Sequence, residues 1–362
     1  MPVEFISLTY PNSSTELSPV PKAPIDTKFL VRYARAVEDA GFDYTLLPYS
    51  SSSFDNFTIA AAISEHTEKV RPIVALRPNT VYPTVAARSL ATLDQLSEGR
   101  AVVHVIAGGS DREQAREGDF LDKASRYDRA GEYIDILRRA WSDHEAFDHR
   151  GTYYEFEDFR NDVRPVNGTI PVSVGGSSDS AYRLGGKSAD IFGLWGEPLA
   201  ETAEQIAAVD AAAAAAGRSD RPRFWVTFRP IIAPTEELAW EKAGRVLTAL
   251  ERNAAVNPIS SHRPENVGSR RLLDLAARGE VHDRALWTVP AAVTNAQGAS
   301  TALVGTPETV AAAILDYVDL GATLISIRGY DNYNDVIDYG RYVLPLIRQE
   351  LTRREHADAF SH

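Results

Sequence analysis

The chain has 362 residues, a formal net charge of −12 and no cysteine. The acidic balance, with no basic stripe, argues against a nucleic-acid or anionic-membrane partner, and the lack of cysteine excludes disulfides, thiolate metal sites and cysteine nucleophiles. The sequence holds no run of 18 apolar residues and no leader-like N-terminus, so we expect a soluble cytoplasmic protein. Its length suits one large α/β domain over residues 1–362.

Short apolar runs alternate with amphipathic segments along the chain. The pattern predicts strands over residues 3–8, 44–47, 72–76, 101–107, 171–174, 190–195, 224–232 and 323–328. Nearly continuous apolar strands separated by helices indicate a parallel sheet buried on both faces, and eight of them in βα order predict a TIM-like (β/α)8 barrel. Three segments stand outside the alternation: a loop predicted over 108–125, a hairpin predicted over 147–156, and an irregular stretch at 254–302 that we expect to form a mobile lid. The final helix is expected over 335–351.

In such a barrel the active site lies at the carboxyl ends of the strands. The residues at these ends are Tyr10, Tyr49–Phe54, Arg77, His104–Gly109, Gly175–Ser178, Trp195, Arg229 and Arg328–Tyr330. The set is aromatic, glycine-rich and basic, without the acid pair of a glycosidase and without an HxH or HExxH pattern. We therefore expect no metal, and instead a flat, phosphorylated cofactor that carries the chemistry.

The stretch IPVSVGGSSDSAYRLGGKS, residues 170–188, has the form of a phosphate-binding turn. A short β-branched strand leads into Gly175 and Gly176, which allow close backbone approach, and Ser177 and Ser178 can cap the helix that follows. Free N–H groups at this helix start would face an anion. The alternative is an ordinary strand-to-helix turn with a serine cap.

Four segments together resemble the bacterial-luciferase-like flavin monooxygenases, and within them the alkanesulfonate monooxygenases that use reduced FMN from a separate reductase. They are VALRPNTVYPTVAARSLATLDQLSEGRA (74–101), FLDKASRYDRAGEYIDILRRAW (120–141), VGGSSDSAYRLGGKSADIFGLWGEP (174–198) and TALVGTPETVAAAI with IRGY near the C-terminus. The resemblance spans nearly the whole chain, and it implies a luciferase-like TIM barrel with insertions.

The resemblance also implies a flavin site. The cofactor-binding residues would be Gly175, Gly176, Ser177, Ser178, Tyr127, His104, Ala107 and Arg77, with the first five around the FMN phosphate. Ser53 matches a position where the sulfonate enzymes carry a cysteine near the flavin. The alternatives are a core role for Tyr127, a structural role for His104 and a plain loop position for Ser53.

The substrate side departs from the family pattern. Along the seventh strand the sulfonate enzymes have an arginine and a histidine, where this chain has Thr227 and Arg229. Arg229 and Arg328 are permanently charged forks able to grip a sulfonate, carboxylate or phosphonate. The alternative is an ion pair with an acid such as Asp55 or Glu197. The predicted substrate-binding residues are Tyr10, Arg229, Arg328 and Tyr330.

The function implied is a two-component, FMNH2-dependent monooxygenase of sulfur metabolism that uses O2 to convert an alkanesulfonate to an aldehyde and sulfite. Its catalytic residues would be Trp195, Tyr330, Arg229, Ser53 and His104. A homodimer or dimer of dimers through the helices 55–66 and 84–96 is also implied. Three alternatives stay open: a deazaflavin (F420)-dependent dehydrogenase or reductase of the same fold, a monooxygenase of sulfones or N-heterocycles, and a non-catalytic flavin-binding relative.

Overall fold

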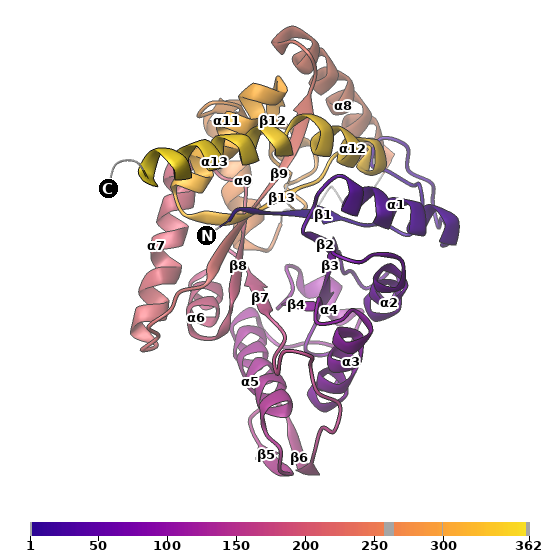
Figure 1. Ribbon diagram of the computed structural model, residues 1–362, viewed down its shortest axis with the longest axis vertical. Helices are drawn as coiled ribbons and strands as arrows, with labels where there is room; N and C mark the ends of the chain where they lie inside the picture. The colour runs from indigo at the N-terminus through magenta and orange to yellow at the C-terminus, as the bar shows by residue number, and fades with distance from the viewer. Residues whose placement is uncertain (1, 257–263, 299, 360–362) are drawn as a thin grey trace. The chain divides into compact units, whose positions relative to one another are not determined.

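The computed structural model describes residues 2–256, 264–298 and 300–359. These residues form two compact units, and most of their elements are labelled in Figure 1. The first unit lies within residues 1–43, 194–204 and 224–362, and the second comprises 44–193 and 205–223.

The first unit is built on a mostly parallel sheet. Four parallel strands run in the order β1 (Glu4–Leu8), β13 (Ala322–Ile327), β9 (Arg223–Ile232) and β12 (Ala302–Gly305). Two short strands, β11 (Leu286–Trp287) and β10 (Val281–His282), continue it in antiparallel fashion beyond β12. The helices of this unit are α1 (Thr27–Asp39), α8 (Glu236–Val256), α9 (Val267–Arg278), α10 (Val289–Val293), α11 (Pro307–Asp319), α12 (Asn332–Tyr342) and α13 (Leu344–Ala359).

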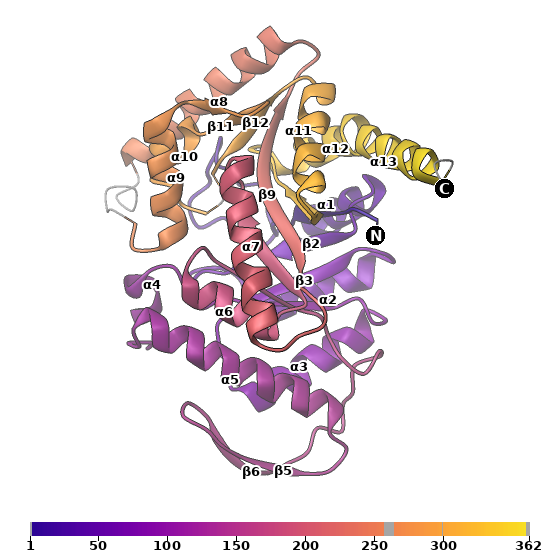
Figure 2. The same ribbon diagram turned by 90° about the vertical axis from the view of Figure 1, so that its left-hand side faces the viewer.

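The second unit carries a fully parallel sheet, β2 (Tyr44–Leu47), β3 (Arg71–Leu76), β4 (Val102–Val105), β7 (Val172–Gly175) and the first part of β8 (Ile191–Trp195). Its helices are α2 (Asn56–His66), α3 (Pro83–Leu96), α4 (Asp111–Ala115), α5 (Lys123–Ser142), α6 (Asp179–Ser188) and most of α7 (Leu199–Ala215). The predicted hairpin is present as β5 (Phe147–Arg150) and β6 (Glu155–Phe159), paired antiparallel. Figure 2 shows α3 and α5 packed side by side.

Local sequence accounts for where the helices begin. The side chains of Asp26, Asp55 and Ser178 accept hydrogen bonds from the third N–H of α1, α2 and α6. Each cap satisfies a backbone donor that has no carbonyl one turn earlier, which stabilises the helix by about 1 kcal/mol. In α1 the buried residues recur at helical spacing, so one face packs inward.

The fold class is the predicted one. Strands β1, β2, β3, β4, β7, β8, β9 and β13 occur in βα order, and within each unit these strands pair in parallel. This is a TIM-like (β/α)8 fold. The extra strands β5, β6, β10, β11 and β12 belong to insertions in the eightfold pattern.

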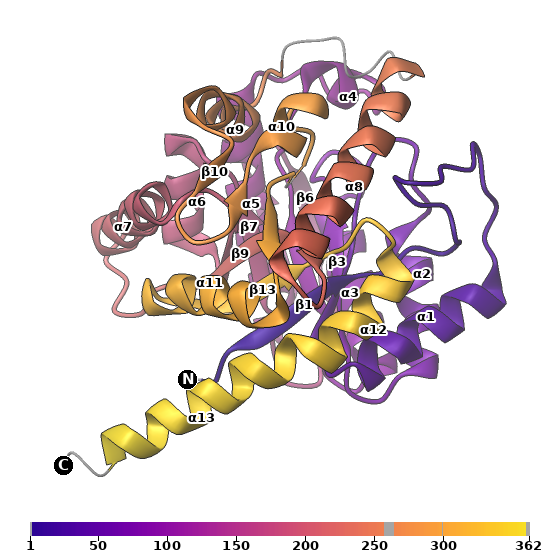
Figure 3. The same cartoon turned by 90° about the horizontal axis from the view of Figure 1, so that it is seen from above.

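The predicted final helix over 335–351 is two helices. Helix α12 ends at Tyr342 and helix α13 begins at Leu344. Figure 3 labels both helices. Pro345 is the physical reason, because it lacks an N–H and its ring clashes with the carbonyl of the preceding turn. Proline is tolerated in the first turn of a new helix, which is its place in α13.

Two stretches expected to be irregular contain regular structure. Residues 108–125 include the short helix α4, capped by Ser110. The predicted lid, 254–302, carries α9, the β10–β11 pair and α10, and it leads into β12, a four-residue strand paired with β9. Part of this prediction falls on residues 257–263 and 299, which lie outside the described residues.

Candidate active site

The predicted phosphate-binding turn is formed between β7 and α6. Gly176 has φ +141°, a conformation that L side chains rarely adopt. A Cβ at this position would lie 2.7 Å from the Tyr127 hydroxyl oxygen and 2.8 Å from Cβ of Ala181. The neighbouring Gly175 leaves room for the Gly193 carbonyl oxygen, which would be 3.0 Å from an added Cβ. Both glycines are therefore required by close approach.

Tyr127 joins this turn from α5, as the sequence predicts. Its ring is buried, and its hydroxyl lies against Gly176 and hydrogen-bonds the Ser178 side chain. Burial raises the pKa of Tyr127, and the Ser178 bond opposes that shift only in part. The phenol therefore stays protonated at neutral pH and offers a hydrogen-bond donor beside the turn.

His104 lies on β4 next to the turn. The strand register places it opposite Ser173 of β7, and its Nδ1 is 2.9 Å from the Ser173 hydroxyl oxygen. The ring edge also lies near Gly175, whose added Cβ would be 3.4 Å from the His104 Cε1 atom. Burial lowers the pKa of His104 to about 4, so the imidazole is neutral at pH 7. Ala107, three residues on, is buried at the end of this segment.

The donors around this turn fit a phosphate group. Ser178 caps the N–H of Ala181, while by helix geometry the N–H groups of Asp179 and Ser180 have no carbonyl one turn earlier. The positive end of the α6 dipole adds to them. Ser177 and Ser178 supply hydroxyls. We call Gly175–Ser178 with Tyr127 the phosphate cradle.

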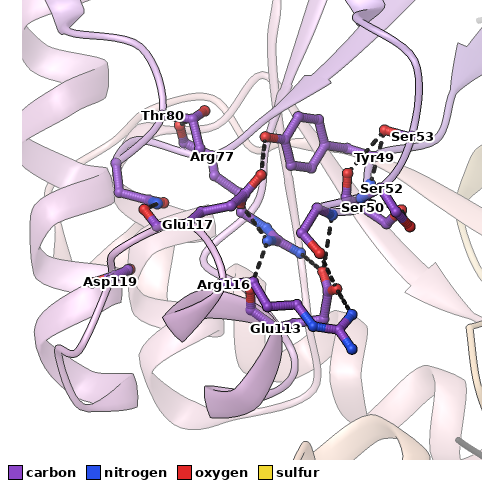
Figure 4. Close-up of polar contacts among 12 residues, drawn as sticks. Tyr49, Ser50, Ser52, Ser53, Arg77, Thr80, Glu113, Arg116, Glu117 and Asp119 are labelled. Atoms are coloured by element: carbon purple, nitrogen blue, oxygen red, sulfur yellow. Dashed lines mark hydrogen bonds and ion pairs between the residues drawn. The ribbon is translucent and has the colours of Figure 1, made fainter.

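Arg77, at the end of β3, is held by an acidic pair (Figure 4). Its guanidinium donates to Glu117 at 2.6 Å and to Glu113 at 2.8 Å, and it lies over the Tyr49 ring. The Tyr49 hydroxyl in turn donates to Glu117 at 2.6 Å. Both terminal nitrogens of Arg77 are thus engaged with α4 and the residues just after it. The predicted flavin contact of Arg77 stays a prediction.

Ser53 lies in the loop that follows β2, shown in Figure 4. Its hydroxyl donates to the Ser50 carbonyl at 3.0 Å and accepts from the Ser50 N–H at 3.2 Å. The neighbouring Ser51 donates its N–H and its hydroxyl to Glu113. Ser53 therefore makes its hydrogen bonds within its own loop, and the loop is held to α4 by the hydrogen bonds from Ser51 to Glu113.

Arg229, predicted to bind substrate, makes a buried ion pair on the first unit. Its side chain is 2% exposed, and it donates to the Glu16 carboxylate at 2.7 Å and to the Gly329 carbonyl at 3.1 Å. The guanidinium carbon lies 3.6 Å from the centre of the Tyr330 ring. Burial acts to lower the pKa of Arg229, but the Glu16 charge outweighs it and raises the pKa, so the group is charged.

Arg328 and Tyr10 complete this group. Arg328 lies 3.6 Å from the Glu16 carboxylate and donates to the Tyr10 hydroxyl at 3.4 Å. Among the described residues, the Tyr330 hydroxyl and the Arg229 Nε have no hydrogen-bond partner, although both are buried. We call Tyr10, Glu16, Arg229, Arg328 and Tyr330 the arginine cluster, and it brings together all four predicted substrate-binding residues.

The acids proposed from the sequence as partners of Arg229 were wrong. Asp55 caps α2 by accepting from Thr58, and Glu197 pairs with Arg271 at 2.7 Å. The Asp55 carboxylate is used in capping α2, and the Glu197 carboxylate is bound by Arg271. The partner of Arg229 is Glu16, which the sequence analysis missed.

Trp195, at the end of β8, contacts the segment predicted to be a lid. It packs against a cluster formed by Leu272, Leu275, Ala291 and Ala296 of α9 and α10 and the turn after α10. The described part of 254–302 is therefore attached to the strand end through this tryptophan.

Three acids of these groups escaped sequence reasoning: Glu16, Glu113 and Glu117. Glu16 is in the loop after β1. Its place beyond a strand end was the feature of the sequence that could have marked it as a site residue. Glu113 and Glu117 are four residues apart, the spacing of one helix face, in a stretch predicted to be irregular.

Across the described residues, no group of three or more histidine, aspartate or glutamate side chains could hold a metal ion. The helices within 2–256, 264–298 and 300–359 include none that is long and apolar enough to cross a membrane.

Residues 4–324 match the luciferase-like monooxygenase family, and the chain belongs to that family. Among solved structures, a riboflavin lyase with modified FMN and substrate riboflavin is similar with a TM-score of 0.80. The identity is 23%, over 97% of this chain and 92% of that one. The EDTA monooxygenase of Chelativorans sp. BNC1 has a TM-score of 0.77 at 19% identity, over 97% and 94% of the two chains.

A third similar structure is the coenzyme F420-dependent tetrahydromethanopterin reductase of Methanopyrus kandleri. Its TM-score is 0.69 at 16% identity, over 95% of this chain and 99% of that chain. These likenesses confirm the TIM-like (β/α)8, luciferase-like fold. The luciferase-like monooxygenase family is the one that the sequence resemblance implied.

Proposed function

We propose that the protein is an FMNH2-dependent monooxygenase that receives reduced FMN from a separate NAD(P)H-dependent flavin reductase. Its reaction is the oxidative desulfonation of an alkanesulfonate, in which the sulfonate, O2 and FMNH2 give an aldehyde, sulfite, FMN and water. The observation that carries the flavin part is the phosphate cradle, where two glycines, two serines and Tyr127 surround a helix start. We place this activity in the cytoplasm.

The chain's own residues bind and orient in this proposal. Reduced FMN, when bound, supplies the two electrons that reduce O2. The cradle would hold the FMN phosphate by N–H groups, hydroxyls and the α6 dipole. His104, neutral at pH 7, would add no charge beside the flavin.

The sulfonate would bind at the arginine cluster. Arg229 and Arg328 provide charge that does not titrate near neutral pH, so they act by electrostatics and hydrogen bonding rather than by proton transfer. Burial raises the pKa of Tyr330, against the opposing charge of Arg229, so its hydroxyl stays protonated and can donate to a sulfonate oxygen. Trp195 and the described part of the segment 254–302 would then keep water away from the reacting groups.

A second candidate keeps the fold and changes the reaction. The F420-dependent reductase is similar over nearly the full length of both chains, so a deazaflavin-dependent hydride transfer without O2 is the alternative. The two differ in cofactor: a deazaflavin reaction needs reduced F420 to bind, whereas the monooxygenase needs reduced FMN. Sulfones and N-heterocycles are the alternative substrates within the monooxygenase class.

The reaction is tested by supplying the purified protein with FMN, NADH, a flavin reductase and a panel of sulfonates, sulfones and N-heterocycles. We expect sulfite and aldehyde in equal amounts from at least one sulfonate, with O2 consumed and with no product when the reductase is omitted. Binding of reduced F420 without binding of reduced FMN, together with no O2-dependent product, would establish the deazaflavin alternative instead.

We also infer a homodimer or dimer of dimers formed through α2 and α3. The support is apolar surface on and beside α3, where Tyr82, Val85 and Leu96 are exposed, Leu96 to 59%. Exposed apolar groups gathered on one helix are typical of an interface. Light scattering at micromolar concentration should give at least twice the 39.7 kDa of one chain.

The change Leu96→Glu should shift this mass toward 39.7 kDa, because it would bury a charge in the interface. Phe120→Glu is the matched control, since Phe120 is also exposed but lies outside α2 and α3. A monomeric mass for the unchanged protein would contradict the proposal.

A further inference from the structure

The turn that follows β13 carries Tyr330, and the buried carboxylate of Asp335 holds this turn. One carboxylate oxygen, Oδ2, accepts from the backbone N–H of Tyr330 at 2.8 Å and from that of Asp331 at 2.9 Å. A Cβ added at Gly329 would lie 1.9 Å from the same oxygen, so the carboxylate occupies the space where a side chain at that position would begin. The backbone from Gly329 to Asp331 is therefore fixed to one buried carboxylate.

Arg229 holds the other side of this turn. Its Nη2 atom donates to the Gly329 carbonyl at 3.1 Å, and its guanidinium carbon lies 3.6 Å from the centre of the Tyr330 ring. Asp335 thus binds two N–H groups of the turn, while Arg229 binds a carbonyl of the turn and stacks on the ring. The place of the Tyr330 side chain follows from both contacts.

The Tyr330 hydroxyl is the group in this arrangement that a ligand would bind. It is buried and, within the part of the chain that the structure describes, it has no hydrogen-bond partner. A buried donor without a partner is unfavourable, and a ligand oxygen would satisfy it. A hydrogen bond weakens steeply when its angle or distance departs from the ideal. The strength of this bond therefore depends on the turn that Asp335 holds.

The structural alternative is that Asp335 only caps α12. Its carboxylate accepts from the N–H of the N-cap residue Asp331, while the Asp331 side chain accepts from the N–H of Asn334. Reciprocal bonds of this kind stabilise the start of a helix. The bond to the Tyr330 N–H lies before the N-cap residue, however, so helix capping does not account for it.

We propose that Asp335 is a positioning residue that fixes, through the backbone of Tyr330, where the Tyr330 hydroxyl meets the anionic group of the substrate. The inference rests on the proposed binding of substrate at the arginine cluster, and it deepens that proposal by assigning a role to a residue outside the cluster. Asp335 itself does not contact substrate in this role. Its charge alone would have the opposite effect, because a carboxylate repels an anion and its removal would tighten anion binding.

The test is a double-mutant cycle on anion binding, without turnover. Methanesulfonate is titrated by calorimetry into protein saturated with oxidised FMN, which occupies the phosphate cradle, at constant ionic strength. Asp335→Ala should weaken methanesulfonate binding about tenfold, as should Tyr330→Phe, because either change removes the hydrogen bond from the hydroxyl to a charged oxygen. In the Tyr330→Phe background, Asp335→Ala should cause no further loss of affinity.

Two control variants separate the turn from the charge. Asp335→Asn keeps a carbonyl oxygen that can accept from both N–H groups, so its affinity for methanesulfonate should stay close to that of the unchanged protein. Lys242→Met removes the ammonium that lies 3.4 Å from the second Asp335 oxygen and leaves both N–H bonds in place, so it should also leave the affinity close to unchanged. If Asp335→Ala does not fold, Asp335→Glu replaces it in the cycle, because it keeps the charge and moves the carboxylate by one methylene group.

A second readout needs no sulfonate. Fluorotyrosine incorporated in place of the 15 tyrosines gives a fluorine NMR spectrum in which the Tyr330 resonance is the one missing from Tyr330→Phe. This resonance should move in Asp335→Ala, because the turn that carries the ring is released. It should return to its original position in Asp335→Asn.

Equal weakening by Asp335→Ala in both backgrounds, or an affinity that stays the same or rises, would overturn the proposal and leave Asp335 as a cap of α12. Failure of the proposed function looks different. In that case methanesulfonate does not bind the unchanged protein, and the Tyr330 resonance decides alone. A resonance that moves in Asp335→Ala then supports the positioning role, and one that does not move overturns it.

Discussion

Replacing Arg77 by methionine is expected to lower the free energy of unfolding by about 3 to 5 kcal/mol, the usual cost of breaking a buried ion pair by removing one partner. Arg77 is 5% exposed and holds both Glu113 and Glu117. Without it, two carboxylates would face each other and the Tyr49 hydroxyl across a space filled by a thioether. Urea unfolding followed by circular dichroism measures the change.

Arg116→Met is the matched control because Arg116 pairs with the same Glu113, at 3.0 Å, from an exposed position. Its side chain is 46% exposed, so the loss should be no more than about 1 kcal/mol. If the two variants lose the same stability, burial of Arg77 is not what makes its ion pairs strong, and the explanation given above fails.

The pH dependence of stability should follow the same network. Burial acts to raise the pKa of Glu113, but hydrogen bonds from Ser51 and Arg77 outweigh it and hold the pKa at about 2. This folded-state pKa lies below the unfolded-state pKa of about 4.3. The network therefore stabilises the folded protein at pH values above about 4.3. The contribution is lost as pH falls from about 4.5 toward 2. Arg77→Met should show a smaller loss over this window.

The helix starts and the buried strands could be predicted because their signals are local. Asp26, Asp55 and Ser178 each stand next to the helix they cap, and the cap geometry spans only three residues. The strands of the eightfold pattern are apolar runs bounded by polar or glycine residues, which identifies them without knowledge of their partners.

The elements that were missed depend on contacts or on short length. Helix α4 has five residues, and its carboxylates are bound by Arg77 and Ser51 from other loops. A helix this short is unstable alone, so tertiary contacts rather than propensity decide it. Strand β12 has four residues and pairs with β9, about 70 positions away in sequence. The break before α13, in contrast, has a local signal in Pro345.

The candidate site divides in the same way. Gly175–Ser178 is one continuous stretch, so its glycines and serines were enough to predict a strand-to-helix turn with a serine cap. Tyr127 was expected there only through the family resemblance, and phosphate binding stays a prediction. The partner of Arg229 was not predictable, because Glu16 lies 213 positions earlier among 50 acidic residues. Charge pairing has no sequence period, and only the fold brings the two groups together. The predicted roles of Ser53, Arg77 and Trp195 toward a flavin remain predictions.

Changing Gly176 to alanine is expected to weaken FMN binding by at least about tenfold, or about 1.4 kcal/mol. The added Cβ would lie 2.7 Å from the Tyr127 hydroxyl oxygen and 2.8 Å from Cβ of Ala181, so it would displace Tyr127 or the start of α6. Either movement takes donors away from the position of the phosphate. Fluorescence titration with FMN gives the affinity, and circular dichroism shows whether the fold is kept.

The control for adding a methyl group at positive φ is Gly168→Ala. Gly168 also has positive φ, at +76°, but an added Cβ meets nothing within 4 Å. Alanine is strained at both positions, and more so at Gly176, whose φ of +141° lies outside the left-handed region near which Gly168 falls. Only Gly176→Ala also places a Cβ against the Tyr127 hydroxyl and Ala181. FMN affinity should therefore fall in Gly176→Ala and stay near the unchanged value in Gly168→Ala.

A second variant separates the loss of serine hydroxyl donors from the effect of an added Cβ at Gly176. Ser177→Ala with Ser178→Ala removes two hydroxyls without altering the glycine backbone, and it should also weaken FMN binding because each cap or phosphate contact contributes about 1 kcal/mol or more. Riboflavin has no phosphate, so its binding should be weaker than that of FMN. The riboflavin affinity should be the same in Gly176→Ala, in Gly168→Ala and in the double serine variant. If Gly176→Ala and the double serine variant both bind FMN as the unchanged protein does, the turn between β7 and α6 is an ordinary helix start, and the phosphate must bind elsewhere in the chain.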